Sequence, residues 1–276
     1  MLHLNDTLQK SDGEAAAGIS LRPMGFADIL DTTFSLYRNR FRLFLCISAV
    51  YFFSHIVLST FTHWIISFCE LVLPFLCYAA LTFASAQAYL GKHITARVAF
   101  NQVKYRFWRF IGSSLLYWIV VVFLSVSIIG IPFAIYFLTR WSFYIQAAMV
   151  EKPSATNTLK RSSELVKGAW WRVFGIIIAI WLIYFMIDVI LITSATLIFA
   201  SSGIASEVDL WEIIRQTLWE PHVQLEGILH LLHAIQTAIS ALTMPITAIG
   251  FTLLYFDLRI RKEGFDIEIM LAREEM

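Results

Sequence analysis

Six stretches of the chain are almost continuously apolar, and polar and charged residues return between them. A helix that crosses a bilayer needs about 20 mostly apolar residues, since each residue adds about 1.5 Å along the axis. The pattern therefore predicts an all-α integral membrane protein with six transmembrane helices, paired as three helical hairpins. The predicted spans are residues 43–62, 66–90, 110–128, 131–150, 173–199 and 228–256.

Shorter amphipathic segments precede the first, third and fifth spans, at about 23–38, 94–106 and 154–167. In the first, apolar residues recur at helical spacing, so that one face is apolar. Each segment is followed by an aromatic residue and an arginine, a combination typical of the depth at which a chain enters the bilayer: Phe41-Arg42, Trp108-Arg109 and Trp171-Arg172. We expect an interfacial helix before each hairpin.

These segments also resemble one another in sequence. Residues 97–112 match residues 160–175 at an offset of 63, and residues 30–45 match more loosely at an offset of 67. The second alignment sets Phe41-Arg42 opposite Trp108-Arg109. A threefold helix–hairpin repeat explains the similarity, and so does convergence, because every entry into a span favours Trp and Arg.

The basic residues indicate how the protein lies in the membrane. Nineteen of the 21 Lys and Arg fall in residues 1–42, 91–110, 151–172 or after residue 256. Arg140 lies inside a predicted span, and Arg215 is the only Lys or Arg in the 200–227 loop. Because cytoplasmic loops carry the excess of Lys and Arg, both termini are expected in the cytoplasm. The predicted organisation is a disordered cytoplasmic tail (1–21), a membrane domain (22–268) and a cytoplasmic tail (269–276).

Composition narrows the function classes. The chain is 58% hydrophobic and 15% charged, against about 45–50% and about 25% in soluble domains. A net charge of +1 gives no basic field for nucleic acid. The cysteines Cys46, Cys69 and Cys77 lie in apolar runs without disulfide or metal spacing. No phosphate-binding loop, dinucleotide fingerprint or nucleophile elbow is present, so we expect no enzyme and no cofactor.

Three charged residues fall within the predicted spans: Glu70, Arg140 and Asp188. A charge at bilayer depth is unfavourable and is usually paired or functional. We expect Arg140 to form an ion pair with Asp188 or Glu70. Such a pair would fix the register of the helices, and the alternative is an ion or proton pathway.

A second set of polar residues precedes the sixth span. These four fall on one helical stripe at i, i+4, i+8 and i+11: His222, Glu226, His230 and His233. Imidazole and carboxylate on one stripe could bind Zn²⁺ or another divalent ion. Histidines at a membrane interface or in helix packing give the same pattern, and both interpretations stay open.

The C-terminal run from Leu253 to Glu268 reads LLYFDLRIRKEGFDIE. It resembles the end of the membrane domain of some glycerophosphoryl diester phosphodiesterases, a family that also occurs as stand-alone bacterial membrane proteins. Residues 22–30, Arg140 to Glu151 and Arg161 to Leu165 look similar to that domain as well. The resemblance implies a bacterial cytoplasmic (inner) membrane protein. It implies no catalytic residue, because the phosphodiesterase activity belongs to a separate domain that this sequence does not contain.

The favoured function is a non-enzymatic scaffold or accessory subunit in the lipid bilayer, with a basic cytoplasmic face for anionic lipids, membrane proteins or cytoplasmic proteins. The predicted docking residues are Arg42, Arg109, Arg172, Asp257, Arg259, Arg261 and Lys262. At the end of the sixth span the same charges also fit a capped helix end, with Gly264 as the residue that stops the helix. The alternative function is a small-solute or lipid transporter component that uses Glu70, Arg140 and Asp188.

Overall fold

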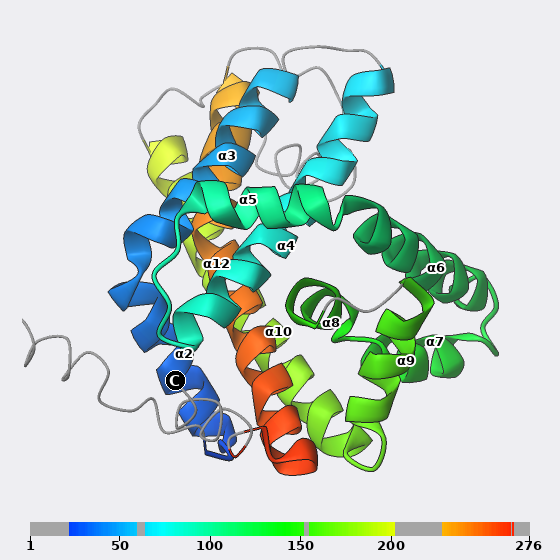
Figure 1. The fold of residues 1–276 in the computed structure, drawn as a ribbon. Helices are drawn as coiled ribbons and strands as arrows, with labels where there is room; N and C mark the ends of the chain where they lie inside the picture. The colour runs from blue at the N-terminus through cyan, green and yellow to red at the C-terminus, as the bar shows by residue number, and fades with distance from the viewer. Residues whose placement is uncertain (1–21, 60–63, 152–154, 202–227, 266, 268–276) are drawn as a thin grey trace, which may run out of the picture.

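The structure is a computed structural model that describes residues 22–59, 64–151, 155–201, 228–265 and 267. Every regular element among these residues is an α-helix, which confirms the predicted all-α fold class (Figure 1). In chain order the helices are α2 (Phe26–Asn39), α3 (Phe41–Ser59), α4 (Trp64–Tyr89), α5 (Ala96–Tyr105), α6 (Phe107–Ser125), α7 (Ile131–Arg140), α8 (Tyr144–Val150), α9 (Ala155–Val166), α10 (Trp170–Ser201) and α12 (Ile228–Glu263).

Five of the described helices are long and apolar enough to cross a membrane, and they coincide with five predicted spans. Their apolar stretches lie in α3, α4, α6, α10 and α12. The outer faces of α6 and α10 expose large apolar side chains such as Phe123 and Trp181. Surfaces of this kind are rare on soluble monomers and are compatible with contact to lipid.

The fourth predicted span has a different structure. Residues 131–150 form α7 and α8, separated by a turn at residues 141–143. Ser162 of α9 donates a hydrogen bond to the carbonyl of Arg140 and accepts one from the N–H of Phe143, both at 3.1 Å. These bonds satisfy backbone groups that a continuous helix would pair internally. The prediction of one helix over 131–150 is therefore wrong, because a neighbouring helix stabilises the break.

The three predicted amphipathic segments are helices, namely α2, α5 and α9. Each leads through a corner into a long apolar helix. Arg40 separates α2 from α3, and Arg106 separates α5 from α6, each with non-helical backbone angles. Gly168 lies between α9 and α10 and has φ +82°. Glycine adopts this left-handed conformation without strain. The corner residues Arg40 and Arg106 are 66 residues apart, close to the offset of 67 in the looser alignment.

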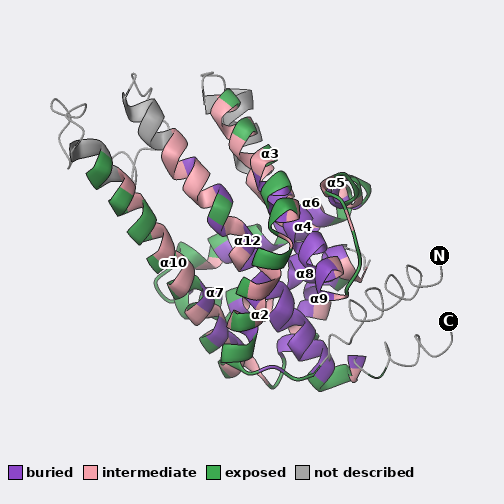
Figure 2. Ribbon diagram, turned by 90° about the vertical axis from the view of Figure 1, so that its left-hand side faces the viewer, coloured by how far each residue is buried: buried purple, intermediate pink, exposed green. Residues whose placement is uncertain are grey.

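Helix α12 runs through the middle of the molecule and packs against α2, α3, α4, α9 and α10 (Figure 1). Its second half contributes the buried side chains Leu253, Leu254, Tyr255 and Phe256. Figure 2 shows that burial is concentrated where α4, α8 and the last turns of α12 meet, while α3, α10 and α12 extend away from that region. We call this densely packed region the cluster end, because the charged groups described next lie in it.

Candidate functional site

Asp257 is the centre of a first group of buried charges, which we call the Asp257 cluster. Its carboxylate is fully buried and lies 2.8 Å from Arg172 of α10 and 2.9 Å from Arg261 one helical turn further on. It also accepts a hydrogen bond of 2.8 Å from the backbone N–H of Met24. Both arginines donate to the Met24 carbonyl at 3.0 Å. One carboxylate thus joins the segment before α2 to α10 and α12.

Glu151 is the centre of a second group, the Glu151 cluster. Arg161 donates to Glu151 at 2.9 Å and to Glu263 at 2.7 Å, so that it lies between two carboxylates. Arg259 approaches the same two carboxylates at 3.3 and 3.2 Å. The hydroxyl of Tyr255 donates to Glu151. Hydrogen bonds to Glu151 and Glu263 raise the pKa of Arg161 above its usual value.

These clusters contain several of the predicted docking residues. Asp257 and Arg259 are buried, and Arg172 and Arg261 bind Asp257 and Met24. Lys262 is exposed, but its ammonium donates to the carbonyls of Glu164 and Lys167 at the end of α9. The charges in the last turn of α12 therefore contact neighbouring segments, but Arg261 and Lys262 stay exposed, and docking by these two residues stays a prediction. Gly264 does end the helix, with φ +63°.

Arg106, which the sequence did not single out, is a further buried cation. Its guanidinium donates to the carbonyls of Ala148 and Met149 at the end of α8. Burial lowers the pKa of Arg106, and the neighbouring Arg109 adds to this effect. A cation at a helix C-terminus is favourable, so Arg106 stabilises the short helix α8.

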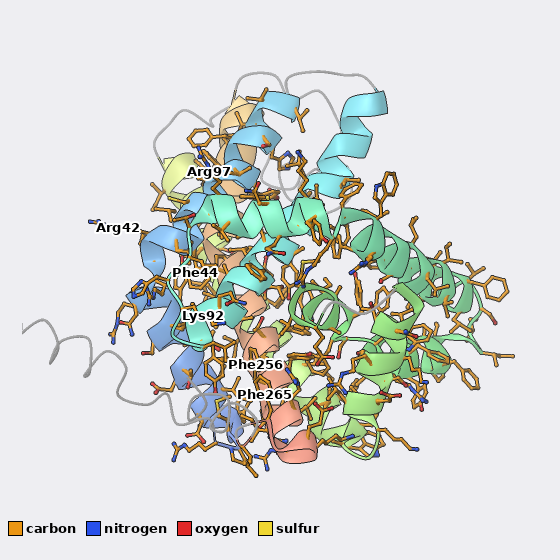
Figure 3. All side chains as sticks on the ribbon, in the orientation of Figure 1. Arg42, Phe44, Lys92, Arg97, Phe256 and Phe265 are labelled. Carbon is orange, nitrogen blue, oxygen red and sulfur yellow. The ribbon has the colours of Figure 1, made fainter. Side chains whose placement is uncertain are left out.

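Other basic side chains remain at the surface. Arg42 and Arg109, both predicted as docking residues, are exposed. Three more exposed cations lie on α5 and on the segment before it: Lys92, Arg97 and Lys104. We call these five residues the basic surface, and Figure 3 labels three of them along one side of the molecule. No described carboxylate forms a salt bridge with any of the five.

Of the charges predicted within the spans, Arg140 and Asp188 are described, and they have different partners. Arg140 donates through Nε to Ser163 of α9 and through Nη1 to the Tyr136 hydroxyl at 2.5 Å. Asp188 instead accepts a hydrogen bond of 3.3 Å from Thr243. The predicted Arg140–Asp188 pair is wrong, because α7 ends beside the polar helix α9. The side chain of Glu70 lies outside the described residues, so its pairing stays a prediction.

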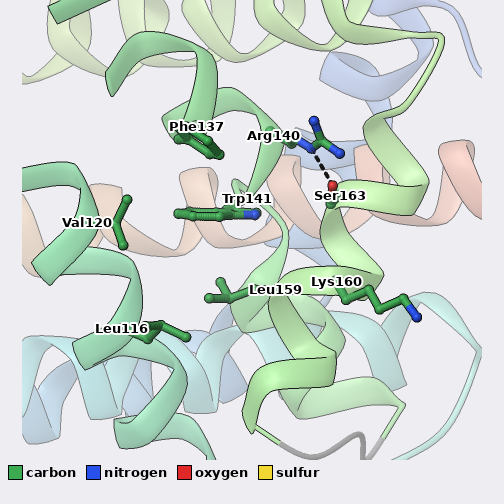
Figure 4. A pocket seen from close by; sticks show the side chains of 8 residues that line it. All are labelled: Leu116, Val120, Phe137, Arg140, Trp141, Leu159, Lys160 and Ser163. Carbon is green, nitrogen blue, oxygen red and sulfur yellow. Dashed lines mark hydrogen bonds between the residues drawn. The ribbon is translucent and has the colours of Figure 1, made fainter. Parts of the chain in front are cut away.

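A cavity of about 410 Å³ opens beside Arg140 between α6, α7 and α9. We call it the Arg140 pocket, and its lining residues are Leu116, Val120, Phe137, Arg140, Trp141, Leu159, Lys160 and Ser163. Figure 4 shows the aromatic and aliphatic side chains gathered on one side, and Arg140, Ser163 and Lys160 on the other. Among the described residues, no carboxylate forms a salt bridge with Arg140 or Lys160.

A larger cavity of about 720 Å³ lies on the other side of α7, between α4, α6, α10 and α12. Aromatic side chains dominate its lining, among them Tyr78, Tyr117, Trp118 and Trp181. Its lining includes Thr139 and Ser142 but no charged side chain. Its chemistry fits an apolar molecule better than an ion.

The predicted metal stripe lies outside the part of the chain that the structure describes. His222 and Glu226 precede α12, and the side chains of His230 and His233 in its first turns are not described. Among the described residues, no three His, Cys, Asp or Glu side chains group as metal ligands. Metal binding by the stripe stays a prediction.

In comparison with known proteins, the chain matches no protein-family model, no curated protein and no solved structure. The resemblance to the phosphodiesterase membrane domain rests on the motifs described above, and membership of that family stays a prediction.

Proposed function

We propose that the protein is a non-enzymatic membrane scaffold that crosses a bacterial cytoplasmic membrane six times and gathers acidic phospholipids around a basic cytoplasmic surface. The observation that carries this proposal is the basic surface, whose five cations have no carboxylate partner among the described residues. A Lys or Arg beside an anionic leaflet contributes about 1 kcal/mol of attraction.

Lipid is favoured over an acidic protein partner because exposed aromatic rings accompany these cations. Trp108, next to Arg109, is 83% exposed, and Tyr105, next to Lys104 in sequence, is 81% exposed. Phe41 is exposed beside Arg42. Aromatic side chains interleaved with Lys and Arg are typical of the headgroup region.

The six-span topology places the basic surface on the cytoplasmic side. In this proposal α7 makes the fourth crossing and ends at Arg140 beside the interfacial helix α9, and α8 continues from there to the side where α5 lies. After Cys46, Cys69 and Cys77 are replaced by serine, a cysteine at Lys92 is expected to resist a membrane-impermeant thiol reagent in intact cells. A cysteine at Ser206, in the predicted external loop, is expected to react. Reversed labelling would contradict the topology.

We expect the purified protein in mixed vesicles to hold more spin-labelled phosphatidylglycerol than phosphatidylcholine at its surface. Substituting Arg42, Lys104 and Arg109 together by glutamine is expected to remove most of this preference, at about 1 kcal/mol per charge. The preference of the unaltered protein is expected to fall as salt rises, since exposed charges are screened. The motionally restricted fraction of each labelled lipid measures the effect.

A matched control keeps the charges of these positions and changes their shape, with Arg42→Lys, Lys104→Arg and Arg109→Lys. This variant is expected to retain the lipid preference. If all three proteins bind both lipids equally, the proposal fails. If the glutamine variant instead loses an acidic protein partner during purification, the surface serves protein docking.

The transporter alternative has less support. It depended on Glu70, Arg140 and Asp188 acting together, and the structure places Arg140 beside α9 and Asp188 beside Thr243 of α12. The aromatic cavity carries no charged group that would select an ionic solute.

A further inference from the structure

We propose that the Arg140 pocket is a discrete binding site for one acidic phospholipid, with the phosphate at Arg140 and an acyl chain along α6. This inference deepens the proposed function, because it replaces a diffuse attraction by one defined lipid site. It depends on residues that are separate from the five cations of the basic surface.

The first argument is the charge of the pocket. Arg140 is half-buried, and its hydrogen-bond partners Ser163 and Tyr136 are both neutral. Every described arginine of the two clusters, in contrast, binds a carboxylate. A partly desolvated guanidinium without an anion is unfavourable, so a bound anion would stabilise it. Guanidinium groups suit phosphate oxygens, which they can bind through two parallel hydrogen bonds.

The second argument is the arrangement of the polar groups. Nε of Arg140 is held by Ser163, and Nη1 by the hydroxyl of Tyr136, whose ring also lies 5.5 Å from the guanidinium carbon. The guanidinium is therefore fixed in place before a ligand binds, which reduces the entropy lost on binding. Lys160 extends at the outer edge of the pocket and adds a second cation (Figure 4).

The third argument is the shape of the apolar side. Val120, Phe137 and Trp141 line the wall opposite the cations. Leu116 at the mouth is exposed, and Ile119 and Phe123 continue the same exposed face along α6. From Leu116 to the end of α6 this stripe covers about 13 Å, at about 1.5 Å per residue. An anion beside an apolar stripe fits a phospholipid better than a soluble phosphate.

The volume agrees with this occupant. The pocket of about 410 Å³ lies within the range of about 300–1,000 Å³ that is usual for small-molecule sites. It accommodates a headgroup phosphate and the start of a chain, while the rest of the lipid lies in the bilayer. Zwitterionic phosphatidylcholine would bring a choline cation next to Arg140 and Lys160, so it is expected to bind less well.

The test is native mass spectrometry of the intact protein, released from detergent with added phosphatidylglycerol or phosphatidylcholine. We expect one phosphatidylglycerol to remain bound at activation energies that remove the others. Arg140→Gln is expected to weaken this lipid about tenfold or more, since hydrogen bonds to charged groups are among the stronger ones. Lys160→Glu, at an exposed position, is expected to weaken it without disturbing the fold.

Lys167→Glu is the matched control, because Lys167 is another exposed lysine close to the end of α9 but does not line the pocket. It is expected to leave the single lipid bound. Equal retention of the lipid in Lys160→Glu and Lys167→Glu would overturn the proposal, and so would equal binding of phosphatidylcholine. Displacement by millimolar inorganic phosphate would show a soluble anion site and would also overturn it.

The spin-label measurement and the mass spectrometry together separate the two proposals. If the triple glutamine variant of Arg42, Lys104 and Arg109 loses its general lipid preference and keeps the single lipid, both proposals stand. If the unaltered protein has no general preference but retains one phosphatidylglycerol, the proposed function fails and the Arg140 site remains.

Discussion

Replacing Asp257 by alanine is expected to destabilise the protein more than any other single substitution at the cluster end. Asp257 is 0% exposed and neutralises Arg172 and Arg261, while it also accepts the N–H of Met24. Without it, two cations converge on a buried backbone carbonyl with no anion between them. Removing one partner of a buried ionic group typically costs about 3–5 kcal/mol.

The measurement is thermal unfolding in mild detergent. At each temperature, the fraction of the protein that is still monodisperse is recorded. Asp31→Ala is the control, since Asp31 is an exposed aspartate on α2. Its substitution is expected to change stability by less than about 0.5 kcal/mol, as is usual at exposed positions. Equal effects of the two substitutions would show that the Asp257 cluster does not stabilise the fold.

The second large effect is expected for Arg161→Met. This substitution leaves Glu151 and Glu263 with Arg259 as their nearest described cation, so that two carboxylates share one guanidinium. The expected loss is again about 3–5 kcal/mol. Adding Glu151→Gln removes one of the uncompensated charges, so the double variant is expected to be more stable than the sum of the two single losses predicts.

A double-mutant cycle measures this coupling, with an expected interaction energy of about 0.5–3 kcal/mol. Lys167→Met removes an exposed cation at the end of the same helix and serves as the control. Additive losses of Arg161→Met and Glu151→Gln would contradict the idea that the Glu151 cluster acts as a unit.

The long helices could be predicted from the sequence because the length of an apolar stretch is enough to indicate a spanning helix. Five of the predicted spans agree with long helices, and the three amphipathic segments are helices as well. The break in the fourth span could not be predicted this way. It depends on Ser162, which lies more than ten residues further along the chain and bonds to both sides of the turn. A hydropathy pattern carries no information on such tertiary hydrogen bonds.

Predicting the candidate site was harder for a related reason. The sequence shows that charges gather near the end of α12, but it does not show which of them face the interior. Asp257 and Arg259 looked like surface residues, and Glu151 and Arg161 were named only as parts of motifs that resemble the phosphodiesterase membrane domain. One signal was available: Glu151 and Glu263 are carboxylates in segments rich in Lys and Arg, where an acidic residue often has a cationic partner.

The bond between Met24 and Asp257 also has a consequence for synthesis in the cell. Its two partners are 233 residues apart in the chain. At a translation rate of about 5–20 residues per second, the segment before α2 waits about 10–50 s before its carboxylate partner is made. Until then Arg172 has no anion from α12, and Asp257 cannot join the segment before α2 to α10. Completion of the fold is thus coupled to the last part of the chain, so a ribosome that stops before α12 would leave a protein in the bilayer whose cluster end cannot close.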